Sequence, residues 1–372
     1  MSRARWRMRK GARVVVGMSG GVDSSVAAAL LVEQGYEVIG VAMRLWAGDD
    51  GASASGCCTL DDFLDARRVA AQLGIPFYVM DFQREFTAAV VDPFVGEYVA
   101  GRTPNPCVRC NQFVKFGAFW ERARELGAEW IATGHYARIS QGATGAPQLL
   151  RARDDAKDQS YFLFAIRPEV LTRCLFPVGE MTKTEVRRIA EVLGLPVAAK
   201  PESQEVCFAP GREYVSFVAK RAAAMSGGEI VDVSGRVVGR HDGVHQFTIG
   251  QRRGLGLGGG QPLYVTEIDA TRREVRVGPR EATAAGGLIA TQVAWTGGAP
   301  AAPGAGLQIK IRSRFEPTPV RVETVGSDHF SVRAARGLVA VTPGQAAVLY
   351  DGQRVVGGGW IQRALPGVAA AA

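Results

Sequence analysis

A glycine-rich turn near the N-terminus most constrains the fold of this chain. Residues 13–16, Arg-Val-Val-Val, are rich in β-branched side chains and precede the turn, while residues 26–32, rich in Ala and Leu, follow it. This order predicts a strand, a tight turn and a helix. Gly20 and Gly21 let the backbone fold sharply and point its N–H groups at an anion, to which the helix N-terminus adds its positive dipole end. We therefore expect a phosphate-binding turn, with serine hydroxyls as further donors.

The turn lacks the Gly-Lys-Ser/Thr ending of the common nucleoside-triphosphatase loop, which argues against a kinase or a GTPase. Its string Ser-Gly-Gly-Val-Asp-Ser, residues 19–24, resembles instead the pyrophosphate-binding loop of ATP pyrophosphatases. Enzymes of that type split ATP into AMP and pyrophosphate while they adenylate a substrate. An ordinary glycine-rich turn is the alternative that the string alone leaves open.

The composition is that of a globular protein without a membrane span. The 372 residues are 47% hydrophobic and 22% charged, and the chain is long enough for two or three domains. The longest apolar run, residues 26–32, is far too short to cross a bilayer, and the N-terminus lacks the apolar core of a secretory signal. We therefore expect a cytoplasmic protein whose six cysteines are mostly reduced.

The net charge of +8 results from 44 basic and 36 acidic residues. Six of the basic residues fall within residues 3–13, which contain no acid, so the rest of the chain carries only +2. Bulk charge therefore permits a nucleic-acid partner without requiring one. We expect residues 1–12 to form a basic, disordered arm.

Strand-like and helix-like segments alternate through the first half of the chain. This alternation is typical of an α/β fold with a doubly wound parallel sheet, in which ligands bind at the carboxyl ends of the strands. The glycine-rich turn, Met43 and Gly134 all lie at such ends. The predicted strands are residues 13–16, 37–43, 77–81 and 130–133; the predicted helices are residues 61–73, residues 85–99 and one that begins at Thr182; a polar loop is predicted at residues 48–56.

The pattern changes near residue 210, beyond which short β-branched segments alternate with glycines. Strand candidates in the last third are spaced as in a small β-barrel or sandwich. We therefore expect an α/β nucleotide-binding domain at residues 13–210, a small central β-rich domain at 211–285, a C-terminal β-barrel at 286–364 and a disordered tail at 365–372.

Two cysteines, Cys107 and Cys110, follow a pair of prolines. The prolines predict a rigid, exposed loop outside any helix, and Arg109 together with a helix starting near Phe113 could lower the pKa of a thiol there. A third thiol, Cys207, also lies outside a predicted helix. The sequence contains no second Cys-x-x-Cys pair, so a zinc ribbon is not expected. Cys57, Cys58 and Cys174 are interpreted as small buried hydrophobic residues.

Further strings extend across the whole chain in a fixed order. They are Thr103-Pro-Asn-Pro106, Cys110-Asn111, Lys115-Phe116, Ala132-Thr-Gly-His-Tyr-Ala-Arg138, Lys157-Asp-Gln-Ser-Tyr-Phe162, Ser203-Gln204, Cys207-Phe208, Thr248-Ile-Gly-Gln-Arg-Arg-Gly-Leu255 and Pro343-Gly-Gln-Ala346. Together with the glycine-rich loop, they make the chain resemble the bacterial tRNA-specific 2-thiouridylase family from about residue 13 to residue 361.

The resemblance implies an ATP-dependent exchange of oxygen for sulfur at C2 of the wobble uridine in tRNAs for Lys, Glu and Gln. The C2 oxygen is a poor leaving group, so adenylation would turn it into AMP, which departs when sulfur attacks C2. The resemblance also implies a protein partner that supplies sulfur, either a sulfur-relay protein or a cysteine desulfurase, and we expect the enzyme to be a monomer.

The resemblance assigns roles to individual residues. Asp23 would help to place Mg²⁺ on the ATP phosphates. Cys207 would receive a persulfide, and Cys110 would release the sulfur, which leaves a Cys110–Cys207 disulfide to be reduced. The expected ATP-binding residues are Gly17, Met18, Ser19, Gly20, Gly21, Val22, Asp23, Ser24, Met43 and Gly134. The expected tRNA-binding residues are Asn105, Pro106, Cys107, His135, Lys157, Asp158, Gln159, Arg312, Ser313 and Gln345.

One position departs from the family pattern. Many members carry an acidic residue suited to acid–base work where this chain has Cys107. The role of Cys107 therefore stays open. With Cys110 and Cys207 it completes a set of three thiols, which could hold three irons of a 4Fe–4S cluster and leave the fourth iron free for sulfide. This cluster route is an alternative to the persulfide route.

Two further functions remain as alternatives. One is an adenylating ligase of the same ATP-pyrophosphatase type that acts on a small metabolite. The other is a noncatalytic RNA-binding protein that retains a nucleotide site. The intact loop and the thiols argue against the second, and the C-terminal β region argues against the first.

Overall fold

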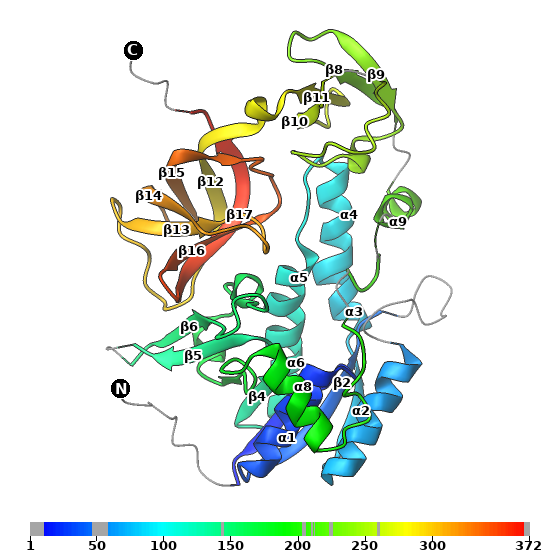
Figure 1. Ribbon diagram of the computed structural model, residues 1–372, viewed down its shortest axis with the longest axis vertical. Helices are drawn as coiled ribbons and strands as arrows, with labels where there is room; N and C mark the ends of the chain where they lie inside the picture. The colour runs from blue at the N-terminus through cyan, green and yellow to red at the C-terminus, as the bar shows by residue number, and fades with distance from the viewer. Residues whose placement is uncertain are drawn as a thin grey trace.

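The computed structural model describes residues 11–46, 59–142, 145–202, 206–209, 211, 213–222, 226–258 and 261–367. Within these ranges the chain forms an α/β domain, a small central sheet and a C-terminal barrel, and helix α4 (Asp92–Val99) reaches from the α/β domain toward the central sheet (Figure 1). Most of the basic arm, the predicted loop 48–56, Cys57, Cys58, Ser203 and Gln204 lie outside the described residues.

The first domain is built on a parallel sheet with the strand order β3-β2-β1-β4-β7. This order and the parallel pairing confirm the predicted doubly wound fold. The glycine-rich loop, Met43 and Gly134 lie at the carboxyl ends of their strands, as expected. The strands are β1 (Arg13–Gly17), β2 (Glu37–Arg44), β3 (Phe77–Asp81), β4 (Trp130–Thr133) and β7 (Cys174–Leu175).

Helices cover both faces of this sheet. Successive side chains of β1 point to opposite faces, so they pack into two separate hydrophobic cores. Val14 and Val16 pack with the first set of helices, and Val15 packs with the second. The first set is α1 (Val22–Glu33), α2 (Leu60–Leu73) and α8 (Lys183–Val192). The second is α3 (Gln83–Phe86), the π-helix η1 (Thr87–Val91), α4, α5 (Pro106–Arg109), the π-helix η2 (Cys110–Ala118) and α6 (Phe119–Glu125).

Two predicted helices, at residues 61–73 and from Thr182, begin within one residue of their predicted starts. Thr59 caps α2 and forms a capping box with Asp62, and Thr182 forms the same arrangement with Glu185 at α8. At the other end of α2, Gly74 has a φ of 67°, a conformation that favours glycine.

The Cys107 segment differs from its prediction. Pro106 does not exclude a helix but opens α5, because the first position of a helix needs no N–H donor. Asn105 caps α5 by accepting a hydrogen bond from the Val108 N–H at 3.4 Å. The helix continues directly into η2, so Cys107 is exposed on a helix, while Cys110 is buried.

The C-terminal domain is a closed antiparallel barrel, as predicted. Its strands follow the order β12-β15-β14-β13-β16-β17, and β12 pairs back with β17. A hairpin of β5 (Ala137–Gln141) and β6 (Pro147–Arg151), not predicted, extends this sheet through the pairing of Leu150 with Arg354. The barrel strands are β12 (Ala284–Trp295), β13 (Gly306–Lys310), β14 (Thr318–Val325), β15 (His329–Val339), β16 (Ala346–Asp351) and β17 (Arg354–Leu365).

The central sheet has the order β10-β11-β8-β9. A helix, α9 (Glu213–Arg221), precedes it where only strands were expected. The strands are β8 (Gly228–Val231), β9 (Val237–His241), β10 (Tyr264–Asp269) and β11 (Glu274–Gly278). Short helical segments elsewhere are η3 (Ser160–Phe162), α7 (Pro168–Leu171), η4 (Val244–Gln246) and η5 (Arg280–Thr283).

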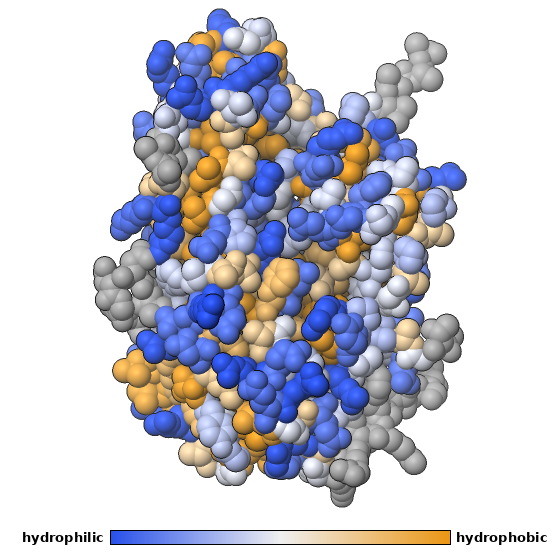
Figure 2. All heavy atoms as spheres, turned by 180° about the vertical axis from the view of Figure 1, so that it is seen from behind, coloured by the Kyte–Doolittle hydropathy of each residue, from blue (hydrophilic) through white to orange (hydrophobic). Residues whose placement is uncertain are grey.

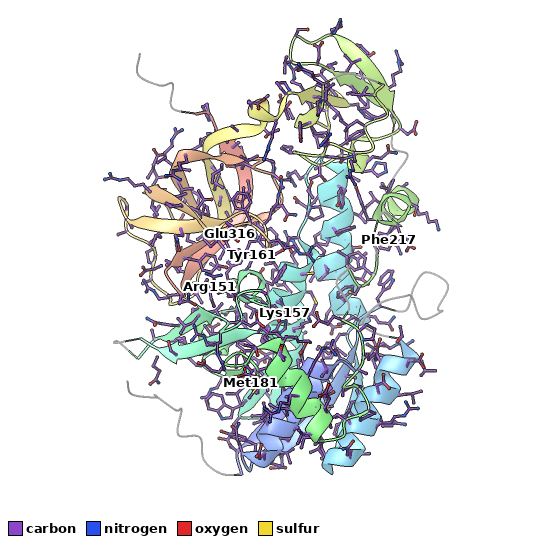
Figure 3. The ribbon with its side chains drawn as sticks, in the orientation of Figure 1. Arg151, Lys157, Tyr161, Met181, Phe217 and Glu316 are labelled. Atoms are coloured by element: carbon purple, nitrogen blue, oxygen red, sulfur yellow. The ribbon has the colours of Figure 1, made fainter. Side chains whose placement is uncertain are left out.

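The α/β domain and the barrel are joined through a buried tyrosine. Tyr161 lies between them (Figure 3), fully buried, and its hydroxyl donates to the Ala346 carbonyl of β16 at 2.9 Å. Seen from behind, polar and apolar side chains are interspersed over the surface (Figure 2). Among the described residues, no helix has the length and apolar character needed to cross a bilayer.

Candidate active site

A cavity of about 350 Å³ opens at the carboxyl ends of β1, β2 and β4. It gathers most of the predicted nucleotide-binding residues in one place, together with side chains from α2, η2 and the segment after α8. Its lining comprises Gly17, Met18, Ser19, Gly21, Val22, Asp23, Ser24, Met43, Leu45, Asp62, Phe63, Lys115, Thr133, Gly134, His135, Tyr136, Lys157, Gln159, Lys200, Pro201 and Glu202.

The loop 17–24 is held by its own serines. The Ser24 hydroxyl accepts from the Ser19 N–H at 3.2 Å and donates to the Gly21 carbonyl at 3.1 Å, and the Ser25 hydroxyl donates to the same carbonyl at 2.9 Å. Gly20 has a φ of +72°, and a Cβ there would collide with the Asp62 carbonyl of α2. Gly21 caps α1 without a side-chain hydrogen bond, so the first N–H groups of α1 can bind an anion.

Gly134 lies directly against this loop. A Cβ at Gly134 would stand 2.5 Å from the Ser24 nitrogen and 2.6 Å from the Asp23 carbonyl carbon. Both are backbone atoms, which cannot move aside as a side chain can. The end of β4 and the start of α1 therefore touch only because residue 134 has no side chain.

A buried lysine, Lys183, which was not predicted from the sequence, links two carboxylates of the cavity wall. Lys183 Nζ lies 2.7 and 2.9 Å from the two Asp23 carboxylate oxygens and 2.7 Å from Glu202 Oε1. Tyr136 donates its hydroxyl to Asp23 at 2.7 Å, and Lys157 Nζ lies 2.6 Å from Glu202 Oε2. Because Lys183 is distant in sequence from Asp23, no local pattern could have indicated this contact.

These contacts keep Glu202 ionised. Burial opposes ionisation of Glu202, but hydrogen bonds from Lys157 and Lys183 outweigh it and lower the pKa of Glu202 to about 2. Burial, and then the charge of Asp23, raise the pKa of the Tyr136 hydroxyl, which stays a hydrogen-bond donor. A second lysine, Lys200, bridges Asp62 at 2.8 Å and Asp65 at 2.6 Å.

The carboxylates that line the cavity are thus each paired with lysine, which decides how Mg²⁺ can bind. Asp23, expected to help place the ion, is occupied by Lys183. In the described part of the chain, no three His, Cys, Asp or Glu side chains form a group that could hold a metal ion. The donor set therefore fits a Mg²⁺ that is held by nucleotide phosphates and water, not one in a protein cage.

Two residues expected to bind the tRNA, Asp158 and Gln159, also make contacts within the protein. The Asp158 carboxylate accepts from the Ala152 N–H at 3.0 Å and from the Ser160 hydroxyl at 2.9 Å. Gln159 accepts from the Tyr136 N–H at 2.8 Å.

His135 lies at the cavity wall between aromatic rings. Its Nδ1 is 2.7 Å from the Thr133 hydroxyl, and its ring contacts those of Phe116 and Phe176. Burial, and then the charge of Lys115, lower the pKa of His135 well below its ordinary value, so the imidazole is neutral.

None of the three thiols of interest lines the cavity. Cys107, Cys110 and Cys207 are reduced, and Cys110 and Cys207 contact the same hydrophobic core. They do not form a metal-binding group within the described residues, so the structure in this conformation does not fit a cluster on the three sulfurs.

The segment of Cys207 is anchored by its neighbour Phe208. The Phe208 ring is buried and packs edge-on against Phe86 and Phe94, with centroid distances of 5.6 and 5.0 Å. Phe217 of α9, labelled in Figure 3, closes the cluster at 5.3 Å from Phe208. Aromatic packing thus fixes where Cys207 can reach.

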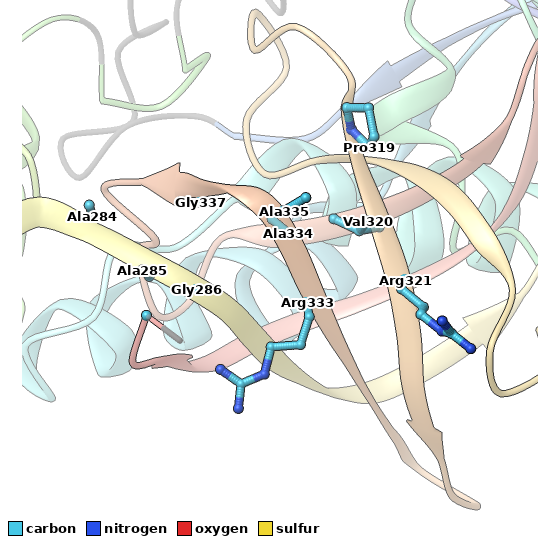
Figure 4. A pocket seen from close by; sticks show the side chains of 11 residues that line it. Ala284, Ala285, Gly286, Pro319, Val320, Arg321, Arg333, Ala334, Ala335 and Gly337 are labelled. Carbon is cyan, nitrogen blue, oxygen red and sulfur yellow. The ribbon is translucent and has the colours of Figure 1, made fainter. Parts of the chain in front are cut away.

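A second, larger hollow of about 510 Å³ lies on the barrel (Figure 4). Alanines and glycines make up much of its lining, and its Arg333 is engaged by Glu323 at 3.1 Å and by the Pro366 carbonyl at 2.7 Å. No thiol, histidine or carboxylate lines it. Arg312, Ser313 and Gln345 also belong to the barrel and line neither hollow.

Comparisons with known proteins match this architecture along the chain. Family models described as "tRNA methyl transferase HUP domain", "tRNA methyl transferase PRC-barrel domain" and "Aminomethyltransferase beta-barrel domain" match residues 12–211, 215–279 and 285–361. The tRNA-specific 2-thiouridylase MnmA of Geotalea uraniireducens is 52% identical over 95% of this chain and 96% of its own length. The enzyme of the same name from Geobacter metallireducens is 53% identical over 95% and 97%. The chain belongs to the tRNA-specific 2-thiouridylase family.

Likeness to solved structures is more remote. A 4-thiouridine synthetase in complex with RNA and ATP gives a TM-score of 0.35 at 17% identity, over 56% of this chain and 50% of that one. An NMN synthetase from Francisella tularensis gives 0.33 at 16% identity, over 52% and 67%.

The contact of Gly134 with the loop predicts a strong effect in this member of the 2-thiouridylase family. Gly134→Ala should abolish binding of a non-hydrolysable ATP analogue in calorimetry, because the new methyl group displaces the backbone of the loop. Gly96→Ala, in α4 where a Cβ meets no atom within 4 Å, is the matched control and should bind normally. Normal binding by Gly134→Ala would contradict the assigned contact.

The buried lysine gives a second prediction. Lys183→Met leaves the Asp23 and Glu202 carboxylates without their shared cation beside the triphosphate, so affinity for the ATP analogue should fall at least about tenfold. Lys220→Met, on the exposed end of α9, removes the same charge elsewhere and should leave affinity unchanged. Equal affinities for the two variants would remove Lys183 from the site.

Proposed function

We propose that this protein is a tRNA 2-thiouridylase. It adenylates the C2 oxygen of the wobble uridine in tRNAs for Lys, Glu and Gln and then transfers sulfur from a protein persulfide, which yields 2-thiouridine, AMP and pyrophosphate. One observation carries the proposal: the cavity wall includes Lys115, five residues after Cys110, and Glu202, five residues before Cys207. The phosphate-binding loop therefore shares the cavity with two residues that are close in sequence to the two thiols.

The first step uses the nucleotide site. The C2 oxygen attacks the α-phosphorus of ATP and pyrophosphate leaves, so that AMP becomes the leaving group at C2. The loop N–H groups and the start of α1 are arranged to bind the phosphates. Mg²⁺ carried by the phosphates would neutralise their charge. We propose the roles of Gly17 to Ser24, Met43 and Gly134 in ATP binding as the sequence predicted them.

The second step uses the thiols. The outer sulfur of a Cys207 persulfide attacks C2, the C2–O bond breaks and AMP departs. Cys110 then attacks the inner sulfur of Cys207, which releases 2-thiouridine and forms a Cys110–Cys207 disulfide. An external thiol reductant supplies two electrons and restores both thiols. A sulfur-relay protein or a cysteine desulfurase loads Cys207 again.

Cys107 is exposed on helix α5 and follows Asn105 and Pro106, where we propose that the target base enters. We assign Lys157, His135 and Ser313 to the path of the tRNA as well. The domain assignment at residues 13–210, 211–285 and 286–364 stays a proposal, as do the basic arm and the tail. We further propose a monomer that acts in the cytoplasm, where tRNA is available.

One experiment distinguishes the persulfide route from the 4Fe–4S cluster route and from the two alternative functions. Unmodified tRNA-Glu is incubated with the protein, ATP, Mg²⁺ and either a persulfide donor or free sulfide, and its nucleosides are measured by mass spectrometry. We expect 2-thiouridine with wild type and with the buried control Cys174→Ala. With the persulfide donor, Cys110→Ser and Cys207→Ser should yield none, because each loses one sulfur of the relay.

Three results would change the assignment. If Cys107→Ser is also inactive with free sulfide, and iron chelation abolishes wild-type activity, the cluster route replaces the persulfide route. ATP–pyrophosphate exchange without RNA, together with no 2-thiouridine, indicates a small-molecule ligase. No ATP turnover with any tRNA indicates an RNA-binding protein.

A further inference from the structure

The loop that leads into α5 is held from the other two domains. Thr103 donates its N–H to the Pro343 carbonyl of the barrel at 2.9 Å. Its hydroxyl donates to the Thr248 hydroxyl of the central domain at 3.1 Å. The Gln345 amide nitrogen donates to the carbonyls of Thr103 and Pro104 at 3.0 and 2.9 Å. The residues just before Cys107 are therefore held by hydrogen bonds to two segments that lie far away in the sequence, one in the barrel and one in the central domain. We call this arrangement the clamp.

The barrel turn at residues 343–345 packs directly against this loop. Gly344 has a φ of +89°, and a Cβ there would stand 2.8 Å from the Thr103 carbonyl oxygen. The turn needs a glycine both for its conformation and for its approach to the loop.

The two clamping segments are also tied to each other. Arg312 Nη2 donates to the Ile249 carbonyl at 3.3 Å, to the Ala340 carbonyl at 2.8 Å and to the Thr342 hydroxyl at 3.0 Å. Gly250 lies so close that a Cβ would stand 2.6 Å from Ala340 Cβ. Arg312 thus locks the central domain onto the barrel beside the loop.

The barrel also contacts α5 on the C-terminal side of Cys107, at Arg109. The Arg109 guanidinium lies over the Trp360 ring of β17, 4.8 Å from its centroid. Barrel contacts therefore flank Cys107 on both sides: Gln345 before it and Trp360 after it.

A side-chain amide nitrogen carries two protons, and Gln345 uses both on protein carbonyls. We propose that Gln345, supported by Thr248 and Arg312, is a positioning residue that fixes the 103–106 loop and thereby presents Asn105 and Cys107 to the target uridine. This inference rests on the proposed 2-thiouridylase function. The barrel then affects the reaction rate by holding the 103–106 loop in place. Gln345 does not bind tRNA through its amide N–H groups, because both are bonded to the loop.

The test compares Gln345→Glu with Gln353→Glu, in the turn between β16 and β17. The first replaces two N–H donors by a carboxylate that faces two carbonyls; the second adds the same charge at an exposed position of the same barrel. Three quantities are measured: hydrogen exchange of residues 101–109, the Kd for unmodified tRNA-Glu, and the single-turnover rate of 2-thiouridine formation at saturating tRNA.

Positioning predicts that Gln345→Glu speeds exchange of residues 101–109 at least about tenfold and lowers the single-turnover rate, because loss of two hydrogen bonds frees the loop. The tRNA Kd should match that of Gln353→Glu. Thr248→Val, which keeps side-chain shape and removes only the hydroxyl bond to Thr103, should change exchange in the same direction without a change in the fold.

Unchanged exchange of residues 101–109 in both Gln345→Glu and Thr248→Val would overturn the proposal. A weaker tRNA Kd with an unchanged rate at saturating tRNA would assign Gln345 to direct RNA binding instead. Since hydrogen exchange needs no turnover, it tests the clamp even if wild type makes no 2-thiouridine, in which case the proposed function alone fails.

Discussion

The ammonium group of Lys183, enclosed by Asp23 and Glu202, is the contact on which the arrangement of the active site depends. Charged groups that leave water are stable only when they are paired and hydrogen-bonded, so these three side chains hold one another in place. Through them the nucleotide loop, the start of α8 and the segment before Cys207 keep fixed positions. Lys157 extends the same network through Glu202. The nucleotide loop and Glu202, which lies five residues before Cys207, are thus parts of one network of charged side chains.

This network explains why the fold suits an exchange of oxygen for sulfur. The reaction needs a phosphate site to activate the oxygen and a thiol site to deliver sulfur, and both must reach the same carbon atom. The parallel sheet supplies the first at its strand ends. The continuous α5–η2 helix contributes Lys115 to the same cavity, and Glu202 in its wall lies five residues before Cys207. The barrel and the central domain hold the loop at Thr103.

Local patterns in the sequence predicted most of the architecture, and contacts between distant residues account for what they missed. The strand–turn–helix at residue 20 and the capping boxes at Thr59 and Thr182 depend on neighbours in the chain. Pro106 was misread because a proline that excludes a helix interior suits a helix start. The pairing of Asp23 with Lys183 and the hydrogen bonds of Gln345 to the 103–106 loop join residues that are far apart in the sequence. Local sequence patterns therefore could not predict them.

The central claim is that ATP activates the uridine C2 oxygen, and isotope transfer tests it most directly. Transfer RNA-Glu carrying ¹⁸O at C2 of the wobble uridine is turned over with ATP, Mg²⁺ and the persulfide donor, and the released AMP is examined by mass spectrometry. The account predicts one ¹⁸O atom in the phosphate of AMP for each 2-thiouridine formed. AMP without ¹⁸O, with the label released into water, would contradict it.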